Sequence, residues 1–336
     1  MEYTSLGKSG IKVSRICLGC MGFGDPNNGQ HSWTVGEGET RKAVKAALDA
    51  GINFFDTAIA YQSGTSERYV GRALRDFAKR DDYVVATKFL PRTVEEMEAG
   101  VSGQQHIERS LDQSLENLGL DYVDLYIYHM WDYHTPLEEI MEGLDNAVRS
   151  GKARAIGIAN CFAWQLAKAN FHARQHGMAE FVSVQNHYNL IAREEEREML
   201  PLCASEEIAV TPYSALAGGR LAKRVGETSK RLEEDEYAKF KYDATSDVDA
   251  AVVSRVAEIA DKYETSMTEV ALAWLLRRAD SPVVGATRVE QIAGMARSVD
   301  LKLSDEDAGY LEEPYVPHAL AGVMAQNGKQ RGGNVV

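Results

Sequence analysis

YVDLYIYH, at residues Tyr122–His129, is an almost unbroken run of apolar, β-branched and aromatic residues of the kind that forms a buried strand. Pro136 then opens a segment with helical spacing of apolar residues, which ends near Ser150 and Gly151. A second strand-like run follows at Ala155–Asn160. This order predicts a βαβ unit, in which a helix connects two parallel strands.

The same alternation of short apolar runs and helical segments extends along the chain. There are eight strand-like runs, each followed by a candidate helix: Val13–Gly19, Asn53–Thr57, Tyr83–Lys88, Tyr122–His129, Ala155–Asn160, Phe181–Asn186, Ala209–Tyr213 and Pro282–Ala286. Parallel strands in this number can close into a barrel, for which about 250 residues is typical before insertions. The 336 residues therefore predict an α/β fold, a (β/α)8 TIM barrel, with 1–336 as one domain and long loops at the C-terminal face.

Three segments exceed what a minimal barrel needs, and we interpret them as insertions: Leu90–Gly103, Gly219–Asp247 and a C-terminal tail at 314–336. A turn at Ser9 and Gly10 predicts a small hairpin at the N-terminal end of the barrel. The long loops are the segments expected to cover a site.

Composition narrows the class of protein. The N-terminus lacks the pattern of a signal peptide, and no apolar run approaches the ~18 residues of a membrane span. The net charge of −13 argues against a nucleic-acid partner. We therefore expect a cytoplasmic protein with no membrane partner. The cysteines are too few and scattered for a secreted disulfide framework, namely Cys17, Cys20, Cys161 and Cys203.

The pair Cys17 and Cys20 has C-x-x-C spacing, which is also found in redox pairs and zinc sites. No second such pair and no His-rich segment accompanies it, so we expect reduced thiols and no metal. The turn after the first strand reads GCMGFG, at Gly19–Gly24, rather than G-x-G-x-x-G. A nucleotide must therefore be held by an arrangement other than the doubly wound fold.

Polar residues end most of the predicted strands, where a purely apolar core would not place them: Asp56, Lys88, His129, Asn160, Gln185 and Tyr213. Each alone has an ordinary structural explanation, such as a turn cap, a rim lysine or a hydrogen-bonded core histidine. Together they would converge on one cavity, because active sites of barrels lie at the carboxyl ends of the strands.

Tyr61 follows Asp56 by a few residues and can lean into the same cavity, although a loop tyrosine packed on the rim is the plainer alternative. Lys88 beside it would lower the pKa of the phenol from about 10, and Asp56 would keep Lys88 protonated. His129 could bind and orient the substrate oxygen. This set suits carbonyl reduction, in which an acid must neutralise the charge that forms on oxygen.

With these residues in place, the chain strongly resembles the aldo-keto reductases from Leu6 to about Val316, in detail a bacterial branch related to potassium-channel β subunits. The segments that carry the resemblance are Asn53–Ala58 with Tyr61, Ala86–Lys88, His129, Val184–Leu190 and Pro212–Leu221. The resemblance assigns Asp56, Tyr61, Lys88 and His129 to the catalytic tetrad of that family. We expect reversible hydride transfer between a nicotinamide cofactor and a carbonyl or alcohol.

The resemblance also implies how the cofactor is held. The carboxamide would be bound by Asn160 and Gln185, the nicotinamide would stack on Tyr213, and Gly219–Asp247 would close over the cofactor as a clasp. Arg288 at a helix N-terminus favours NADP(H), with NAD(H) as the alternative. The expected cofactor-binding residues are Gly19, Cys20, Met21, Asp56, Ala159, Asn160, Gln185, Tyr213, Ser214, Ala215, Leu216, Ala217, Gly218, Gly219, Arg220, Gly285, Thr287, Arg288 and Gln291.

Aromatic residues of the rim loops are expected to line the substrate pocket: Phe23, Trp33, Phe89, Trp131 and Tyr133. They would suit an aldehyde, a ketone, an aromatic carbonyl or a sugar. Two other functions stay open, an NADP-binding regulatory subunit of a membrane partner and a sugar-modifying enzyme with no net redox change. His129 favours turnover, because the channel subunits typically carry asparagine at that position.

Overall fold

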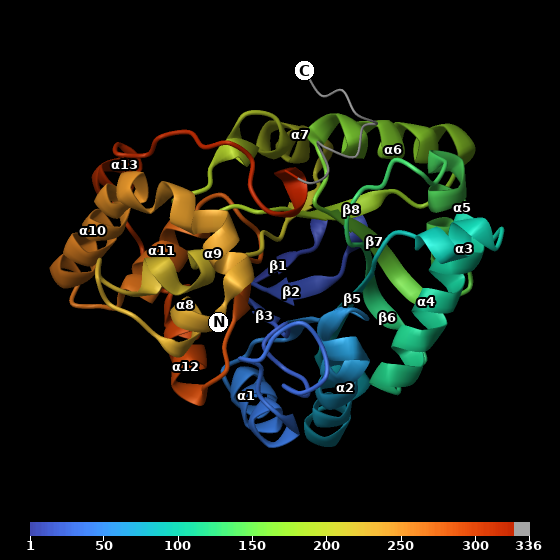
Figure 1. The fold of residues 1–336 in the computed structure, drawn as a ribbon, viewed down its shortest axis with the longest axis horizontal. Helices are drawn as coiled ribbons and strands as arrows, with labels where there is room; N and C mark the ends of the chain where they lie inside the picture. Colours follow the sequence, from blue (N-terminus) through green and yellow to red (C-terminus); the bar gives the residue numbers. More distant parts are fainter. Residues whose placement is uncertain (326–336) are drawn as a thin grey trace.

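A parallel sheet curled into a barrel forms the centre of the computed structural model, which describes residues 1–325 (Figure 1). The sheet has eight strands in the order β10-β3-β4-β5-β6-β7-β8-β9. The strands are β3 (Cys17–Gly19), β4 (Phe54–Asp56), β5 (Val84–Phe89), β6 (Val123–Tyr128), β7 (Ala153–Ala159), β8 (Phe181–Gln185), β9 (Ala209–Val210) and β10 (Val283–Gly285). The predicted (β/α)8 barrel is confirmed.

The barrel closes between β9 and β10. The Val283 N–H donates to the carbonyl of Pro212 at 2.9 Å, and the Asp280 N–H donates to the carbonyl of Val210 at 2.9 Å. No open sheet edge is left at this junction, which is how a barrel satisfies its backbone groups.

Helices surround the barrel on its outer side, as Figure 1 shows. Their bounds are α1 (Glu37–Asp49), α2 (Thr65–Phe77), α3 (Val94–Glu98), α4 (Gly103–Leu118), α5 (Leu137–Arg149), α6 (Ala163–His176), α7 (Met199–Glu206), α8 (Lys230–Glu234), α9 (Glu236–Tyr242), α10 (Ser246–Lys262), α11 (Met267–Leu275), α12 (Val289–Arg297) and α13 (Asp305–Glu312). Pro136 is the N-cap of α5, as its position in the sequence predicts. No helix within residues 1–325 is long and apolar enough to cross a membrane.

Successive residues of each strand face opposite sides of the barrel wall. In β5, Val84 and Ala86 belong to the cluster inside the barrel, whereas Val85 and Phe89 belong to the layer between the sheet and the helices. Lys88 shares the inward parity of Ala86. The sequence therefore places the ammonium of Lys88 inside the barrel, near the carboxyl end of the strand.

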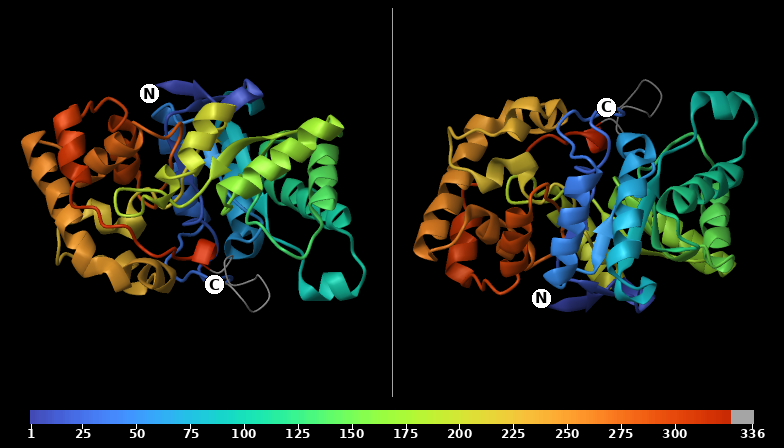
Figure 2. Two further views of the ribbon diagram at one scale, coloured as in Figure 1. Left: turned by 90° about the horizontal axis from the view of Figure 1, so that it is seen from above. Right: turned by 90° about the horizontal axis from the view of Figure 1, so that it is seen from below.

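The predicted hairpin is confirmed, and it closes the amino end of the barrel. β1 (Tyr3–Ser5) pairs antiparallel with β2 (Lys12–Ser14), and Leu6 and Ile11 between them are buried in the cluster inside the barrel. Figure 2 shows the hairpin at the opposite end of the barrel from the last described turn of the tail. The end that carries the polar residues is thus left for ligands.

One predicted strand, Val13–Gly19, is wrong as a single element. The structure divides it into the hairpin strand β2 and the barrel strand β3. The hydroxyl of Ser14 donates to the carbonyl of Ile16 at 2.6 Å, a local bond that redirects the chain between the two strands.

The predicted insertions contain short helices. Residues Leu90–Gly103 include α3, and Gly219–Asp247, the clasp segment, includes α8 and α9. The tail is described only from 314 to 325, so the predicted segment 326–336 lies outside the described residues.

Candidate active site

The strand register brings the predicted polar residues to one end of the barrel. Gly19 pairs with Asp56, and Asp56 pairs with Ala86, two residues before Lys88. On the other side, Ala159 pairs with Gln185, and Asn160 follows directly. The carboxyl ends of β3, β4, β5, β7 and β8 therefore line the same mouth.

Lys88 connects the other residues of the site through hydrogen bonds. Its Nζ donates to Asp56 Oδ1 at 2.5 Å, to the carbonyl of Thr57 at 2.7 Å and to Tyr61 Oη at 3.2 Å. The side chain is 0% exposed. Burial alone lowers the pKa of a lysine, but the charge of Asp56 and the hydrogen bonds to Asp56 and Tyr61 outweigh it and raise the pKa of Lys88. The ammonium therefore stays protonated, with each donor used.

Tyr61 is held by an unusual loop. The two residues after it, Gln62 and Ser63, have φ values of 48° and 51°, which non-glycine residues rarely adopt. The buried Gln62 amide donates to the carbonyl of Asp25 at 2.8 Å and to that of His31 at 3.1 Å. Gln62 thus ties the loop that carries Tyr61 to the loop after β3, a role that the sequence pattern did not reveal.

The expected lowering of the Tyr61 pKa is wrong for this structure. Burial raises the pKa of the phenol above its ordinary value, and the nearby Lys88 charge only partly opposes it. The prediction included the effect of the Lys88 charge on the Tyr61 pKa, but it did not include the loss of hydration around the hydroxyl. Tyr61 therefore carries its proton throughout the neutral pH range.

His129 lies beside Tyr61, with ring centroids 5.9 Å apart and planes at 77°. Burial, with a smaller contribution from the Lys88 charge, lowers the pKa of His129 to about 3. Its buried Nδ1 has no hydrogen-bond partner among the described residues. A neutral imidazole can bind a substrate oxygen, but it cannot be the acid at neutral pH.

The amides expected to hold a cofactor are fixed by the same network. Gln185 Nε2 donates to Asp56 Oδ2 at 2.9 Å, and Asn160 Nδ2 donates to the carbonyl of His129 at 2.9 Å. Asn160 Oδ1 accepts from the Tyr213 hydroxyl at 2.9 Å. Asn160, Gln185 and Tyr213 therefore share one wall of the mouth with the tetrad.

After Tyr213 the chain makes a tight turn. Ser214 and Ala217 have φ values of 60° and 50°, and the following Gly218 and Gly219 have 66° and 105°. Glycine tolerates these angles, and a Cβ on Gly218 would lie 2.9 Å from that of Ala238 in the clasp. Of the other expected residues here, Ala215 and Ala217 are buried, Leu216 packs against the core, and Arg220 pairs with Asp243 at 2.5 Å.

The residues expected to bind the adenosine end of the cofactor lie beside β3. Gly285 pairs with Gly19, and exposed Arg288 is the N-cap of α12. The Gln291 side chain accepts from the backbone N–H groups of Thr287 and Arg288 at 3.0 and 3.1 Å. Gln291 therefore caps the helix in this structure, and the guanidinium of Arg288 is the group that faces solvent.

On the β3 side, the Cys20 N–H donates to the carbonyl of Asp56 at 2.8 Å, and Met21 is half-buried. Cys17 and Cys20 are free and buried, and burial raises the pKa of both thiols. These residues contribute backbone to the mouth rather than a reactive thiol.

The residues present fit a nicotinamide dinucleotide. Asn160 and Gln185 carry the amide groups that recognise a carboxamide, and a left-handed turn rich in glycine suits the close approach of an anion. The unpartnered Nδ1 of His129 and the cations of the clasp and of Arg288 are groups that a polar, anionic ligand can satisfy.

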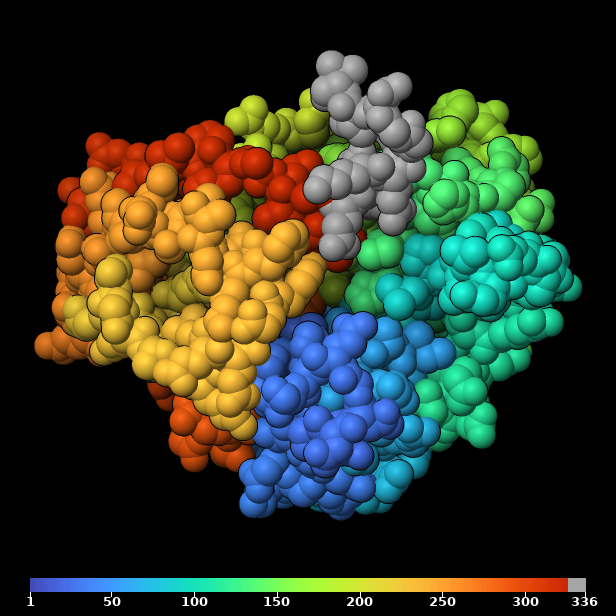
Figure 3. Space-filling view, viewed as in Figure 1, coloured from blue at the N-terminus to red at the C-terminus, as the bar shows by residue number. Residues whose placement is uncertain are grey.

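The residues predicted to line the substrate pocket do not stay together. Phe23 and Phe89 are fully buried in the outer layer, and Phe89 stacks on Tyr128 at 5.2 Å because its strand parity is opposite to that of Lys88. Trp33 lies under Arg231 of the clasp at 4.4 Å. The space-filling view shows part of the clasp, in yellow and orange, next to the N-terminal part of the chain, in blue (Figure 3).

Trp131 and Tyr133 remain in the loop after β6, near His129. Trp131 lies 6.1 Å from Trp164, and the Tyr133 hydroxyl accepts from Gln165 at 2.9 Å. Both residues follow His129 within four positions.

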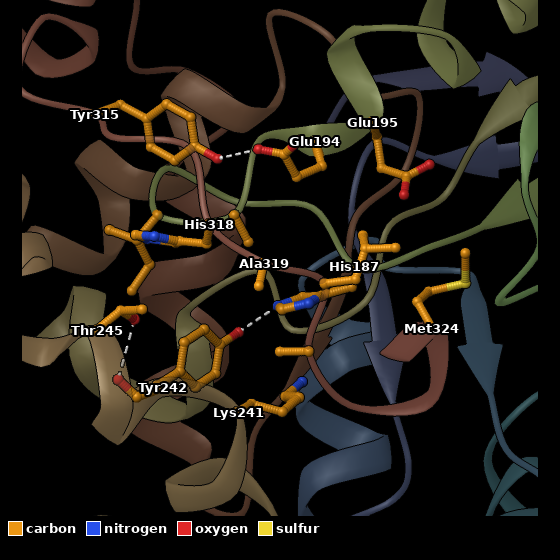
Figure 4. Close-up of a pocket in the computed structure, with 14 residues that line it drawn as sticks. His187, Glu194, Glu195, Lys241, Tyr242, Thr245, Tyr315, His318, Ala319 and Met324 are labelled. Carbon is orange, nitrogen blue, oxygen red and sulfur yellow. Dashed lines mark hydrogen bonds between the residues drawn. The ribbon is translucent and has the colours of Figure 1, made fainter. Parts of the chain in front are cut away.

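Several polar residues near the mouth were missed by sequence reasoning. His187 stacks on Tyr213 with centroids 5.6 Å apart and contacts Tyr242 Oη at 2.6 Å (Figure 4). Lys241, in the clasp, donates to Ser214 Oγ at 3.1 Å. His187 stands inside the quoted Val184–Leu190 motif, but nothing local in the sequence identifies Lys241 as a buried cation.

Comparisons with known proteins agree with this geometry. The aldo/keto reductase family model matches residues 15–315. Versiconal hemiacetal acetate reductase of Aspergillus parasiticus is 38% identical, over 95% of this chain and 98% of its own. A Schizosaccharomyces pombe protein provisionally named an aryl-alcohol dehydrogenase is 37% identical, over 95% and 97%. The crystal structure of a thermostable aldo-keto reductase with the inhibitor epalrestat superposes with a TM-score of 0.75 at 26% identity, covering 94% of this chain and 100% of that one.

Proposed function

Because the chain belongs to the aldo-keto reductase family, we propose that it transfers hydride reversibly between NADP(H) and an aldehyde, ketone or alcohol. Proteins of this family are oxidoreductases that act on carbonyl and alcohol groups with nicotinamide cofactors. The observation that carries the proposal is the Lys88 ammonium, which joins Asp56 Oδ1 and Tyr61 Oη in one buried network.

In this mechanism Tyr61 is the general acid of reduction and the general base of oxidation. Asn160 and Gln185 would hold a bound nicotinamide, which would supply or accept the hydride. Tyr61 Oη gives its proton to the substrate oxygen while negative charge forms there. The Lys88 ammonium then stabilises the phenolate, and neutral His129 binds the same oxygen and orients it. Asp56 holds Lys88 in place.

The preference for NADP(H) is supported by Arg288, an exposed cation at the N-terminus of α12 that suits a phosphate. Among substrates we favour aromatic carbonyls, because aromatic residues follow His129 at Trp131 and Tyr133 and one relative bears the name aryl-alcohol dehydrogenase. A cytoplasmic location is part of the proposal, supported by the four free cysteines.

The expected branch, bacterial and related to channel β subunits, stays a prediction, and the relatives reported above are fungal. An intact tetrad at Asp56, Tyr61, Lys88 and His129 supports turnover over a purely regulatory role. The roles of the clasp and of each cofactor-binding residue likewise belong to this proposal.

A panel of aldehydes, ketones and alcohols, followed through NADPH absorbance beside NADH, tests the proposed function. We expect turnover of aromatic aldehydes with NADPH at a higher kcat/KM than with NADH. Absence of turnover with every carbonyl, together with cofactor binding, would favour the regulatory function. Product formed from a sugar without net oxidation of NADPH would favour the non-net redox function.

The shifts in pKa predict the pH profile of reduction. Protonated Tyr61 is the reactive form, and its raised pKa keeps it protonated at neutral pH, so kcat should stay level from about pH 6 to 9. No limb should appear near the ordinary histidine pKa of about 6.5, because His129 is held at about 3. Oxidation needs the phenolate and should accelerate as pH rises. Profiles at saturating cofactor and substrate check this, and a limb of reduction at pH 7–8 would contradict it.

A further inference from the structure

Lys241, on α9 of the clasp, is buried without a matching negative charge. The residue is 8% exposed, and no carboxylate lies within 4.0 Å of Nζ among residues 1–325. Nζ donates to Ser214 Oγ at 3.1 Å. It also lies over the rings of Tyr213, Tyr237 and Tyr242, at 5.0, 5.4 and 5.2 Å. A buried ammonium is costly unless an anion or several dipoles compensate it.

Two arginines of the clasp that act electrostatically on Lys241 already have carboxylate partners. Arg220 pairs with Asp243 at 2.5 Å, and Arg231 pairs with Asp235 at 3.2 Å. Asp235 also accepts from the Ala238 N–H at 2.9 Å as the cap of α9. Arg220 and Arg231 are thus each matched by a carboxylate, whereas no carboxylate pairs with Lys241 among the described residues.

Lys241 lies where the proposed cofactor leaves the barrel. Ser214 directly follows Tyr213, the expected stacking partner of the nicotinamide, and opens the left-handed turn through Gly219. Figure 4 shows Lys241 and Tyr242 of the clasp in the same pocket as His187. An anion beside the Ser214 hydroxyl would be within reach of the Lys241 ammonium.

We propose that Lys241 pairs with the diphosphate of the bound dinucleotide and thereby couples cofactor binding to the position of the clasp. The inference rests on the proposed function and adds a binding residue to it. It also explains why a lysine is buried at this place: the missing negative charge is that of the ligand.

The competing explanation is that the tyrosine rings compensate the charge and Lys241 only stabilises the clasp. Gly322 of the tail packs near its stem, since a Cβ there would lie 2.9 Å from Lys241 Cδ. In that case substitution would lower the thermal stability of the free protein and leave cofactor affinity almost unchanged. The two explanations therefore differ in a binding measurement that needs no turnover.

The test is NADPH binding to Lys241→Gln, measured by tryptophan fluorescence and calorimetry. We expect the dissociation constant to rise roughly 10- to 100-fold, the usual effect of losing a hydrogen bond to a charged group. Lys241→Arg should recover part of the affinity. The control is Lys239→Gln on the same helix, because Lys239 pairs with Glu236 at 2.7 Å on the surface, and it should bind as the wild type does. A change below twofold in Lys241→Gln overturns the inference.

A fragment locates the contact. Adenosine 2′-monophosphate lacks the diphosphate, so its affinity should be the same in the wild type and in Lys241→Gln. Equal losses for the fragment and for NADPH would overturn the assignment to the diphosphate. If the wild type binds neither nucleotide, the proposed function itself fails, which separates the two failures.

The pH dependence of binding gives an independent readout. Burial lowers the pKa of Lys241 to about 7, Asp235 opposes this shift, and Arg231 and Arg220 add to it. A bound anion would raise that pKa, so NADPH should bind more weakly as pH rises from about 7 to 9, where the 2′-phosphate is already ionised. The titratable groups around Lys241 are Tyr213, Tyr237, Tyr242, His187, Asp235, Arg231 and Arg220. Glu194, Glu195, Tyr315 and His318 line the same pocket, and burial raises the pKa of Glu195 to about 7, so the comparison with Lys241→Gln isolates the contribution of Lys241. Lys241→Gln should lose this dependence, and an unchanged slope contradicts the inference.

Discussion

Replacement of Tyr61 by phenylalanine should lower the kcat of carbonyl reduction by about 100- to 10,000-fold, the usual range for loss of a general acid. The substitution removes only the hydroxyl that accepts from Lys88 at 3.2 Å and leaves the ring in place. Since His129 is neutral at working pH, it cannot replace the missing acid. NADPH should bind with nearly unchanged affinity, because the expected cofactor contacts come from other residues.

The measurement is single-turnover oxidation of NADPH beside a fluorescence titration of NADPH. Tyr310→Phe is the matched control, because Tyr310 is an exposed tyrosine on α13 whose hydroxyl contacts Glu258 on the surface. Turnover by Tyr61→Phe within a few-fold of wild type would remove Tyr61 from the proton-donor role. A parallel loss of NADPH binding would instead make Tyr61 a binding residue.

Lys88→Met should abolish turnover and also destabilise the protein by about 3–5 kcal/mol, the typical cost of leaving a buried charge without its partner. Asp56 is buried and loses the ammonium at 2.5 Å, and Tyr61 loses its cation. The side-chain donor that remains to Asp56 is Gln185. Equilibrium unfolding in urea measures the stability, and NADPH oxidation measures the activity.

The double variant Asp56→Asn with Lys88→Met separates charge from packing. It removes both charges, so it should recover much of the stability lost in Lys88→Met but none of the activity. Lys45→Met, which breaks an exposed pair with Asp49, is the control and should change the free energy of unfolding little. Wild-type stability in Lys88→Met would show that the buried ammonium is not needed to compensate Asp56.

The catalytic constellation was predictable because it depends on strand ends. Apolar runs that terminate in Asp56, Lys88, Asn160 and Gln185 mark the carboxyl ends of parallel strands, and barrel closure brings those ends together without further information. The fold could be predicted from less sequence information, since it depends only on the repeated alternation of strand and helix patterns. The wrong single strand at Val13–Gly19 arose because a local Ser14 bond divides an otherwise continuous apolar run.

The substrate pocket was predicted least well, because successive residues of a strand face opposite sides of the barrel wall. The sequence identifies Phe89 as an aromatic residue at a strand end, but one position along a strand decides whether a side chain faces the mouth or the outer layer. The predicted lowering of the Tyr61 pKa was also wrong. Spacing predicts a neighbouring cation, whereas the loss of hydration depends on everything packed around the hydroxyl.

Hydrophobic periodicity and the alternation of strand and helix patterns along the chain were enough to predict the barrel, the mouth at its carboxyl end and the residues that meet there. The protonation of Tyr61 and His129, the unusual backbone of Gln62 and the burial of Lys241 with no carboxylate partner among residues 1–325 could be seen only in the folded chain. Burial, charge compensation and backbone strain are set by neighbours distant in sequence, and they exist only once the chain has folded.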